Sequence, residues 1–247
     1  RDNILMPMSF ADDQTDFAQL SEQMLDDYLD PAGYSSYTMY MQGSVCAEAD
    51  SAYASDVELR GGTYVRDQWA ANDYGLVIWS GHGTPSKAIV GYDGCEDGNL
   101  MYTGYTSSLD DDHPAFIYQK SCSNGFPDAD GNLGFRLLLN GAISTVSSSA
   151  VSWYSRQEGY GDYDTSMTNA GIGYQYMKGL VVDRLPAGDA LMNAKTVVPP
   201  NTDSRLMNIF DFNLYGDPTI GLDSYGCSVV PPMPPGVWSS TDRKSVV

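Results

Sequence analysis

The chain has 247 residues, of which 42% are hydrophobic, and a formal net charge of −19 at pH 7. This length suits one large α/β domain or two small ones. The negative charge argues against nucleic acid or an anionic membrane as a partner, because both bind basic surfaces. No apolar stretch reaches the ~18 residues that a membrane-spanning helix needs. The acidity fits either simple solubility or bound calcium.

The first third of the chain alternates predicted strands and helices. Residues 3–10 read as an apolar strand, and Pro7 within it predicts an edge position or a bulge, because proline lacks an amide hydrogen. Apolar residues recur at helical spacing over residues 16–29, which predicts a helix. A strand is then expected at 37–41, and helices at 47–57 and 65–72.

Two short apolar runs in the middle of the chain are each followed by a reactive residue. Leu76–Ser80 precedes His82, and Ala115–Gln119 precedes Cys122. Such runs, ending in turn residues, are typical of buried parallel strands, and ligands bind beyond the carboxyl ends of such strands. A thiol beside an imidazole can become a strong nucleophile, so the pair predicts cysteine-nucleophile hydrolysis. Taken singly, each residue also fits an ordinary structural role.

The remaining segments complete an α/β pattern. The glycine- and acid-rich residues 84–113 are expected to form an active-site loop with one short helix. Alternating strands and helices predict a mainly parallel, three-layer α/β/α sandwich. The later elements are expected as helices at 132–140, 166–183 and 189–196, a strand at 142–146, and, over 213–222, a turn that leads into a last strand.

The cysteines and the C-terminal tail indicate the setting of the domain. If Cys122 is the nucleophile, at most one disulfide can form among Cys46, Cys95 and Cys227. Abundant tyrosine and few basic residues suit an extracellular protein. The proline-rich tail predicts a semi-rigid linker. We therefore expect a folded domain over residues 1–224 and a linker over 225–247 that leads to a further domain.

Several motifs resemble those of one enzyme family. Ser80-Gly81-His82-Gly83 and Lys120-Ser121-Cys122-Ser123-Asn124-Gly125 resemble the histidine and cysteine motifs of clan CD cysteine peptidases, and more specifically of the gingipain family. Later segments similar to the family are 132–135, 141–146, 152–154 and 213–219. The resemblance covers roughly residues 3–223. It implies a caspase-like fold and a gingipain-like cysteine endopeptidase domain over residues 1–224.

The resemblance also implies a mechanism. Cys122 would attack a peptide carbonyl, while His82 takes the thiol proton and later protonates the leaving amine. The backbone N–H groups of Gly83 and Cys122 would hold the oxyanion. In this family a carboxylate can orient the histidine. The candidates are Asp12, Asp13 and Asp16, which equally suit a helix N-terminus.

The substrate pocket is expected to include Lys120, Ser121 and Trp153. In clan CD the residue two before the cysteine often lines the pocket for the P1 side chain, the one next to the scissile carbonyl. An ammonium there would favour an acidic P1 residue, unless Lys120 points elsewhere or pairs with an acid such as Asp128. Trp153 matches a tryptophan that closes the pocket in gingipains, and core packing is its alternative role.

A calcium site is a further expectation. Asp128 and Asp130 alternate like the first ligands of an EF-hand loop, but Gly131 comes one place early and Leu139 stands where the loop needs glutamate. Residues 110–112 and 162–164 are other acidic candidates. The chemistry itself requires no cofactor.

Two other functions are compatible with the same motifs. A sortase-like transpeptidase of the family would form the same thioester and pass the acyl group to an amine. A non-catalytic, acidic structural or assembly module of a surface protein would keep the fold without turnover. The expected partner is a protein or peptide substrate, and the expected setting is a secreted or cell-surface, multidomain protein.

Overall fold

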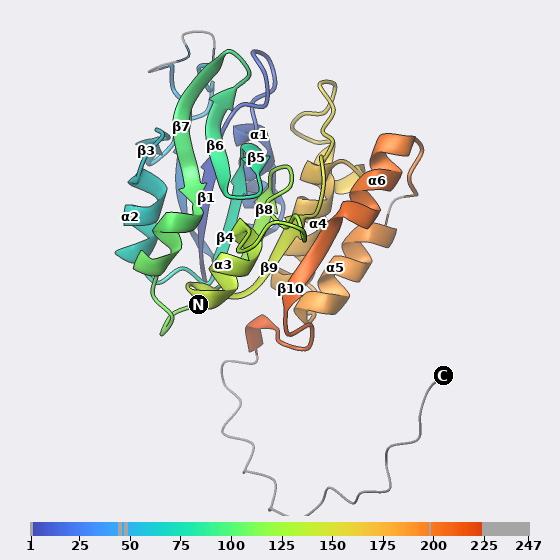
Figure 1. The fold of residues 1–247 in the computed structure, drawn as a ribbon. Helices are drawn as coiled ribbons and strands as arrows, with labels where there is room; N and C mark the ends of the chain where they lie inside the picture. Colours follow the sequence, from blue (N-terminus) through green and yellow to red (C-terminus); the bar gives the residue numbers. More distant parts are fainter. Residues whose placement is uncertain (1, 44–45, 47–48, 198, 224–247) are drawn as a thin grey trace, which may run out of the picture.

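The computed structural model describes residues 2–223 apart from 44–45, 47–48 and 198 (Figure 1). The expected linker at 225–247 therefore lies outside the described residues. No described helix is long and apolar enough to cross a membrane. The elements are β1 (Asn3–Met8), α1 (Ala18–Met24), the π-helical η1 (Leu25–Leu29), β2 (Ser35–Tyr40), β3 (Val57–Glu58), α2 (Tyr64–Ala70), β4 (Leu76–Ser80), β5 (His82–Thr84), β6 (Lys87–Tyr92), β7 (Cys95–Tyr102), the 3-10 helix η2 (Thr103–Ser108), β8 (Ala115–Lys120), α3 (Leu133–Leu139), β9 (Ala142–Ser148), the 3-10 helix η3 (Tyr163–Thr165), α4 (Asn169–Val181), α5 (Ala187–Thr196), α6 (Asp203–Asp211) and β10 (Phe212–Gly216).

A seven-stranded sheet forms the centre of the molecule, in the order β10-β9-β8-β4-β1-β2-β3. Neighbouring strands are parallel except β10, which runs antiparallel to β9. A separate sheet of β5, β6 and β7 is antiparallel. Helices lie on both faces of the main sheet (Figure 1). The predicted caspase-like α/β/α fold with a mainly parallel sheet is confirmed.

Each central strand supplies side chains to two cores, because successive residues of a strand point to opposite faces. In β4, Ile78 packs with α1, α4 and α5, whereas Val77 and Trp79 pack with α2 and α3. In β8, Tyr118 packs in the same core as Ile78, and Ile117 packs in the same core as Val77 and Trp79. Central strands that are apolar on both faces fit the interior of a parallel sheet, which explains the continuous apolar runs in the sequence.

Pro7 lies in an interior strand, so the expected edge position is wrong. It pairs with Met39 of β2, while β4 flanks the other side of β1. On the β4 side the register includes Ile4, Leu5 and Met8 but skips residues 6–7. The ladder with β4 is interrupted where the amide hydrogen is missing, so the proline is accommodated within the sheet.

The segments with the weakest sequence pattern differ most from prediction. Most of the expected loop at 84–113 is the hairpin β6–β7 followed by η2, with Gly91, Gly94 and Gly98 at positive φ. The expected helix at 47–57 is absent from its described residues. A disulfide joins Cys46 to Cys95 and ties this segment to β7. A covalent tether and glycine-dependent turns explain why periodicity failed here.

Candidate active site

The carboxyl ends of β4 and β8 bring the two reactive residues to one edge of the sheet. Ser80 at the end of β4 is in register with Lys120 at the end of β8, and the amide of Gly81 donates to the carbonyl oxygen of Lys120 at 3.1 Å. His82 then begins β5, and Cys122 follows β8. His82 and Cys122 both line a small cavity of about 50 Å³. His82 and Cys122 therefore lie at the same edge of the sheet, as the sequence predicted.

Gly83 lies directly against the backbone of the cysteine. A Cβ atom built on Gly83 would come within 2.1 Å of the carbonyl oxygen of Cys122 and 2.7 Å of its amide nitrogen. Side chains do not tolerate contacts that short, so only glycine fits this position. The close approach brings together the backbones of the two residues expected to form the oxyanion hole.

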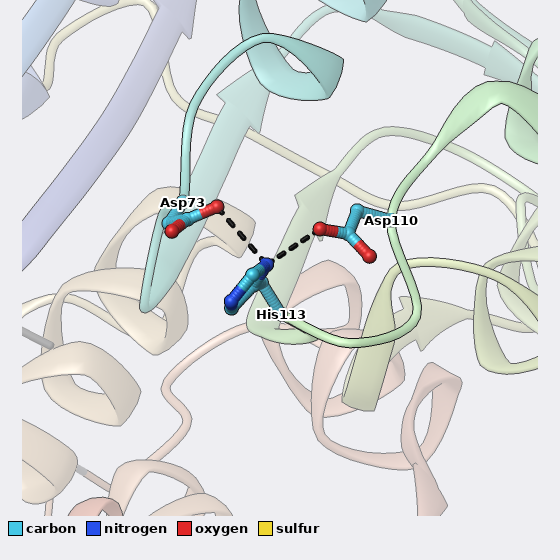
Figure 2. A group of neighbouring side chains, drawn as sticks. All are labelled: Asp73, Asp110 and His113. Atoms are coloured by element: carbon cyan, nitrogen blue, oxygen red, sulfur yellow. Dashed lines mark hydrogen bonds and ion pairs between the residues drawn. The ribbon is translucent and has the colours of Figure 1, made fainter.

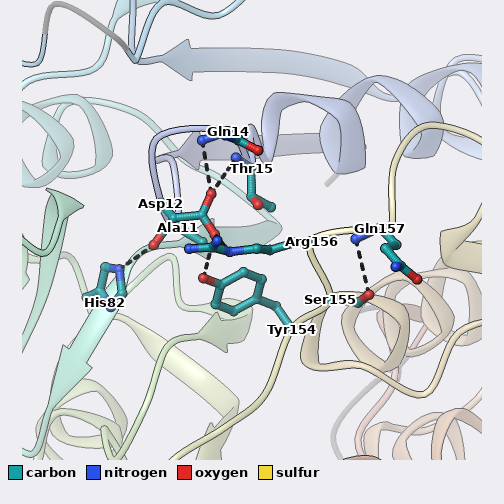
Figure 3. Close-up of polar contacts among 9 residues, drawn as sticks. All are labelled: Ala11, Asp12, Gln14, Thr15, His82, Tyr154, Ser155, Arg156 and Gln157. Carbon is teal, nitrogen blue, oxygen red and sulfur yellow. Dashed lines mark hydrogen bonds and ion pairs between the residues drawn. The ribbon is translucent and has the colours of Figure 1, made fainter.

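His82 is oriented by a backbone carbonyl rather than by a carboxylate. Its Nε2 lies 2.8 Å from the carbonyl oxygen of Ala11 (Figure 3). A carbonyl oxygen only accepts hydrogen bonds, so Nε2 carries the proton, and Nδ1 of the neutral ring is free to accept one.

The three expected carboxylate partners of His82 have other contacts or face solvent. Asp12 accepts hydrogen bonds from Tyr154, Arg156 and the amides of residues 14 and 15 (Figure 3). Burial disfavours its charged form, but these hydrogen bonds outweigh burial and lower the pKa of Asp12 to about 2. Asp16 accepts from Ser51 and from the amide of Ala18. Asp13 is exposed and lines a larger cavity of about 330 Å³ on which His82 also borders.

The Cys122 thiol is free and partly buried, and it contacts the loop after β9. The amide of Ser152 donates to Sγ of Cys122 at 3.4 Å, and the thiol lies 3.6 Å from the Ser152 carbonyl oxygen. Sequence reasoning missed Ser152, because the serine-rich run at 147–152 carries no spacing signal.

A hydrogen-bond clamp fixes the turn that carries the nucleophile. Asn124 is fully buried, and its side-chain amide donates to the carbonyl oxygens of Thr84 and Lys87 in the β5–β6 hairpin. It also accepts a hydrogen bond from Ser121, which in turn accepts one from Trp79. Ser123, the residue after the proposed nucleophile, has a φ of 55°, a backbone conformation that is uncommon for residues other than glycine and asparagine. The clamp therefore holds the cysteine turn against the histidine hairpin.

Lys120 points into the same cavity and is 3% exposed. Its Nζ donates to Oγ of Ser80 at 3.1 Å and lies 3.1 Å from the centroid of the Phe17 ring. Burial lowers the pKa of Lys120 to about 7, partly offset by the charges of Cys122 and Glu158. Asp128 is not its partner.

Of the other two predicted pocket residues, only Ser121 lies at the cavity. Ser121 lines the cavity, whereas Trp153 does not; the Trp153 side chain is 44% exposed and borders a separate hollow with Arg205. Tyr154, the next residue, takes a place in the cavity wall. An exposed tryptophan also does not fit the alternative of core packing.

Within the described part of the chain, neither Asp128 nor Asp130 belongs to a group of three ligand side chains. Both are exposed, and calcium at this loop stays a prediction. Among the residues that the structure describes, one group of three side chains has its ligand atoms within 4.8 Å of one another: Asp73, Asp110 and His113 (Figure 2). Nδ1 of His113 lies 2.5 Å from Asp110 and 3.1 Å from Asp73, so the members pair with one another. They lie before β4 and β8, at the end of the sheet opposite the cavity.

A histidine and a free cysteine at adjacent strand ends of this sheet are the arrangement of caspase-like cysteine peptidases. The model of peptidase family C25 matches residues 2–223. The chain therefore belongs to family C25, the gingipain family of clan CD.

Solved structures agree with this fold. The Arg-specific cysteine proteinase gingipain R matches with a TM-score of 0.60 and 14% identity, over 89% of this chain and 47% of that one. The complex of the Porphyromonas gingivalis RgpB pro- and mature domains matches with a TM-score of 0.57 and 16% identity, over 88% and 47%. The chain thus spans about half the length of these structures, and at such identity the likeness shows the fold. Among curated proteins, none matches this sequence significantly.

Proposed function

We propose that this domain is a cysteine endopeptidase in which Cys122 is the nucleophile and His82 the general acid and base. The observation that carries the proposal is the cavity that both side chains line, with Nε2 of His82 turned to Ala11 and Nδ1 left as the basic nitrogen. Family membership supports peptide-bond chemistry in general. The assignment of the dyad and of endopeptidase activity is our own.

The proposed reaction proceeds in two halves. Nδ1 of His82 takes the proton from Cys122, and the thiolate attacks the peptide carbonyl carbon to form a C–S bond. The amides of Gly83 and Cys122 stabilise the resulting oxyanion, and the histidine returns its proton to the leaving amine as the C–N bond breaks. Water, deprotonated by His82, then attacks the thioester, which releases the acid and restores the thiol.

The disulfide supports an extracellular setting for this activity. Cys46 and Cys95 are bonded, and such bonds persist mainly in oxidising compartments. A protease that acts outside the cell, on protein or peptide substrates, is consistent with the acidic composition.

The test measures cleavage of a peptide library by the wild type and by Cys122→Ala and His82→Ala, with mass spectrometry of the products. We expect each variant to lose at least about 10³-fold in rate. His113→Ala is the matched control and should retain activity, because His113 lies at the other end of the sheet. A product with a new carboxyl terminus indicates hydrolysis, whereas a product joined to an added amine indicates a transpeptidase. Absence of cleavage, with Cys122 unreactive towards an acyloxymethyl ketone, would refute the proposal and favour a structural module.

A further inference from the structure

Lys120 is a buried basic side chain beside the proposed nucleophile, and within the described part of the chain it forms no ion pair with a carboxylate. Its Nζ donates to the Ser80 hydroxyl and lies over the rings of Phe17 and Tyr154, which leaves donor capacity on an ammonium that has three N–H groups. The charges of Cys122 and Glu158 only partly offset the cost of its burial, and buried lysines are rarely found unpaired. Such a group is suited to an anion that arrives with the substrate.

The shape of the cavity limits what that anion can be. Its volume of about 50 Å³ suits a short side chain better than the long side chain of arginine. Gly81, Tyr154 and Asn169 line it together with Lys120 and Cys122. Because the scissile carbonyl must lie at Sγ of Cys122, the substrate side chain next to that carbonyl is the one within reach of this cavity.

We propose that the site cleaves after aspartate, whose carboxylate enters the cavity and pairs with the Lys120 ammonium. The inference rests on the proposed function of Cys122 and His82 and adds the substrate class. A carboxylate would add an ion-paired hydrogen bond to the one that Nζ donates to Ser80. It would also favour the charged form of a lysine whose pKa burial lowers to about 7.

Asparagine is the most informative competitor. It has the size of aspartate without the charge, and Asn169 offers it a second partner. Asn169 is 3% exposed, its Nδ2 donates to Ser152, and its Oδ1 has no hydrogen-bond partner among the described residues. An asparagine side chain could donate to that oxygen. If the amide of Asn169 rather than the charge of Lys120 selects the substrate, asparagine will equal or exceed aspartate.

The experiment compares fluorogenic peptides that differ at P1 alone: aspartate, glutamate, asparagine, alanine, arginine and lysine. For the wild type we expect kcat/KM with aspartate to exceed that with asparagine by at least about 100-fold, because the uncharged analogue leaves the buried ammonium unpaired. Glutamate should be intermediate, since it is longer. Equal rates with aspartate and asparagine, or a preference for arginine or lysine, would overturn the inference and leave the proposed peptidase intact.

The variant Lys120→Met removes the charge and keeps the length of the side chain. The aspartate-to-asparagine ratio should fall to about one, and persistence of the wild-type ratio would overturn the inference. Lys178→Met, in α4 and outside the cavity, makes the same chemical change and should keep the ratio. The wild-type comparison needs no variant, so it decides even if Lys120→Met does not fold.

An irreversible probe separates failure of this inference from failure of the proposed function. Aspartyl and asparaginyl acyloxymethyl ketones are compared for the rate at which they label Cys122, read by peptide mass spectrometry. Faster labelling by the aspartyl probe supports the inference. Faster labelling by the asparaginyl probe overturns it and retains the nucleophile. No labelling by either probe, together with no cleavage of any peptide, refutes the nucleophile itself.

Discussion

The chain has two histidines, and they lie at opposite ends of the same pair of strands. His82 follows the carboxyl end of β4, borders a cavity and contacts the backbone carbonyl of Ala11. His113 precedes β8, is partly exposed and contacts two carboxylates (Figure 2). A carbonyl fixes the tautomer of a ring without adding charge, which leaves the second nitrogen available for proton transfer. Two carboxylates instead make His113 a member of a surface ion-pair group.

Sequence neighbours alone do not distinguish the two histidines. His113 has the acids nearby, in Asp110-Asp111-Asp112, whereas His82 is flanked by glycines. What separates them is the strand end on which each lies, since ligands bind beyond the carboxyl ends of parallel strands. Variants at the two ends should therefore differ in kind, with activity lost at one and only stability changed at the other.

Among variants that leave His82 and Cys122 unchanged, the largest effect is expected for Gly83→Ala. The added methyl group would clash with the Cys122 backbone, at 2.1 Å from its carbonyl oxygen, and would displace the amides that we propose to hold the oxyanion. We expect kcat/KM to fall by at least about 10²-fold. Gly134→Ala is the matched control, because its nearest neighbour would lie at an ordinary 3.4 Å. Activity of Gly83→Ala within threefold of the wild type would contradict the close approach of the two loops.

The sequence alone predicted the two strands that carry His82 and Cys122, because the pattern of each strand lies within a short stretch of the chain. The runs before His82 and Cys122 are apolar on both faces, as interior strands must be, and each of the two residues lies two positions beyond the end of its strand. The topology rule then sufficed to bring them together. The helices expected at 16–29, 132–140, 166–183 and 189–196 are present as α1 with η1, α3, α4 and α5.

The features of the site that could not be predicted from the sequence depend on contacts between distant segments of the chain. The acceptor for His82 is a main-chain atom of residue 11, and main-chain acceptors leave no trace in side-chain identity. Asn124, Ser152 and Tyr154 act through hydrogen bonds or cavity walls that only the folded chain defines. The sequence pattern did not predict the helix α6. The strand β10 covers Phe212–Gly216, where a turn was expected, and so lies earlier in the chain than the predicted last strand.

A smaller effect is expected for Asp12→Asn, which removes a charge next to the residue that orients His82. The pKa of Asp12 in the folded protein is about 2, below its ordinary value of 3.8, so its ionised form stabilises the fold above about pH 4. That contribution is lost as the pH falls through 2. Because its partner Arg156 is 65% exposed, we expect a difference of about 1–2 kcal/mol in the free energy of unfolding at neutral pH.

The measurement is thermal and urea unfolding of the wild type and Asp12→Asn between pH 2 and 7. The difference between them should be full at neutral pH and shrink towards zero near pH 2. Asp13→Asn is the control, because this neighbouring side chain is exposed, and it should change stability by less than about 0.5 kcal/mol. A difference that does not depend on pH would mean that packing, not charge, is what Asp12 contributes.

The smallest effect is expected at the opposite end, for His113→Gln. The ring contacts Asp110 and Asp73, but all three side chains are partly exposed, at 37%, 43% and 55%. Exposed ion pairs contribute little and are screened by salt, so unfolding should change by less than about 1 kcal/mol, and by still less in 0.5 M salt. Peptide cleavage should be unchanged, as measured with the same fluorogenic substrates. A loss of activity similar to that of a His82 variant would show that the two ends of the sheet are coupled, and the contrast between the two histidines would then fail.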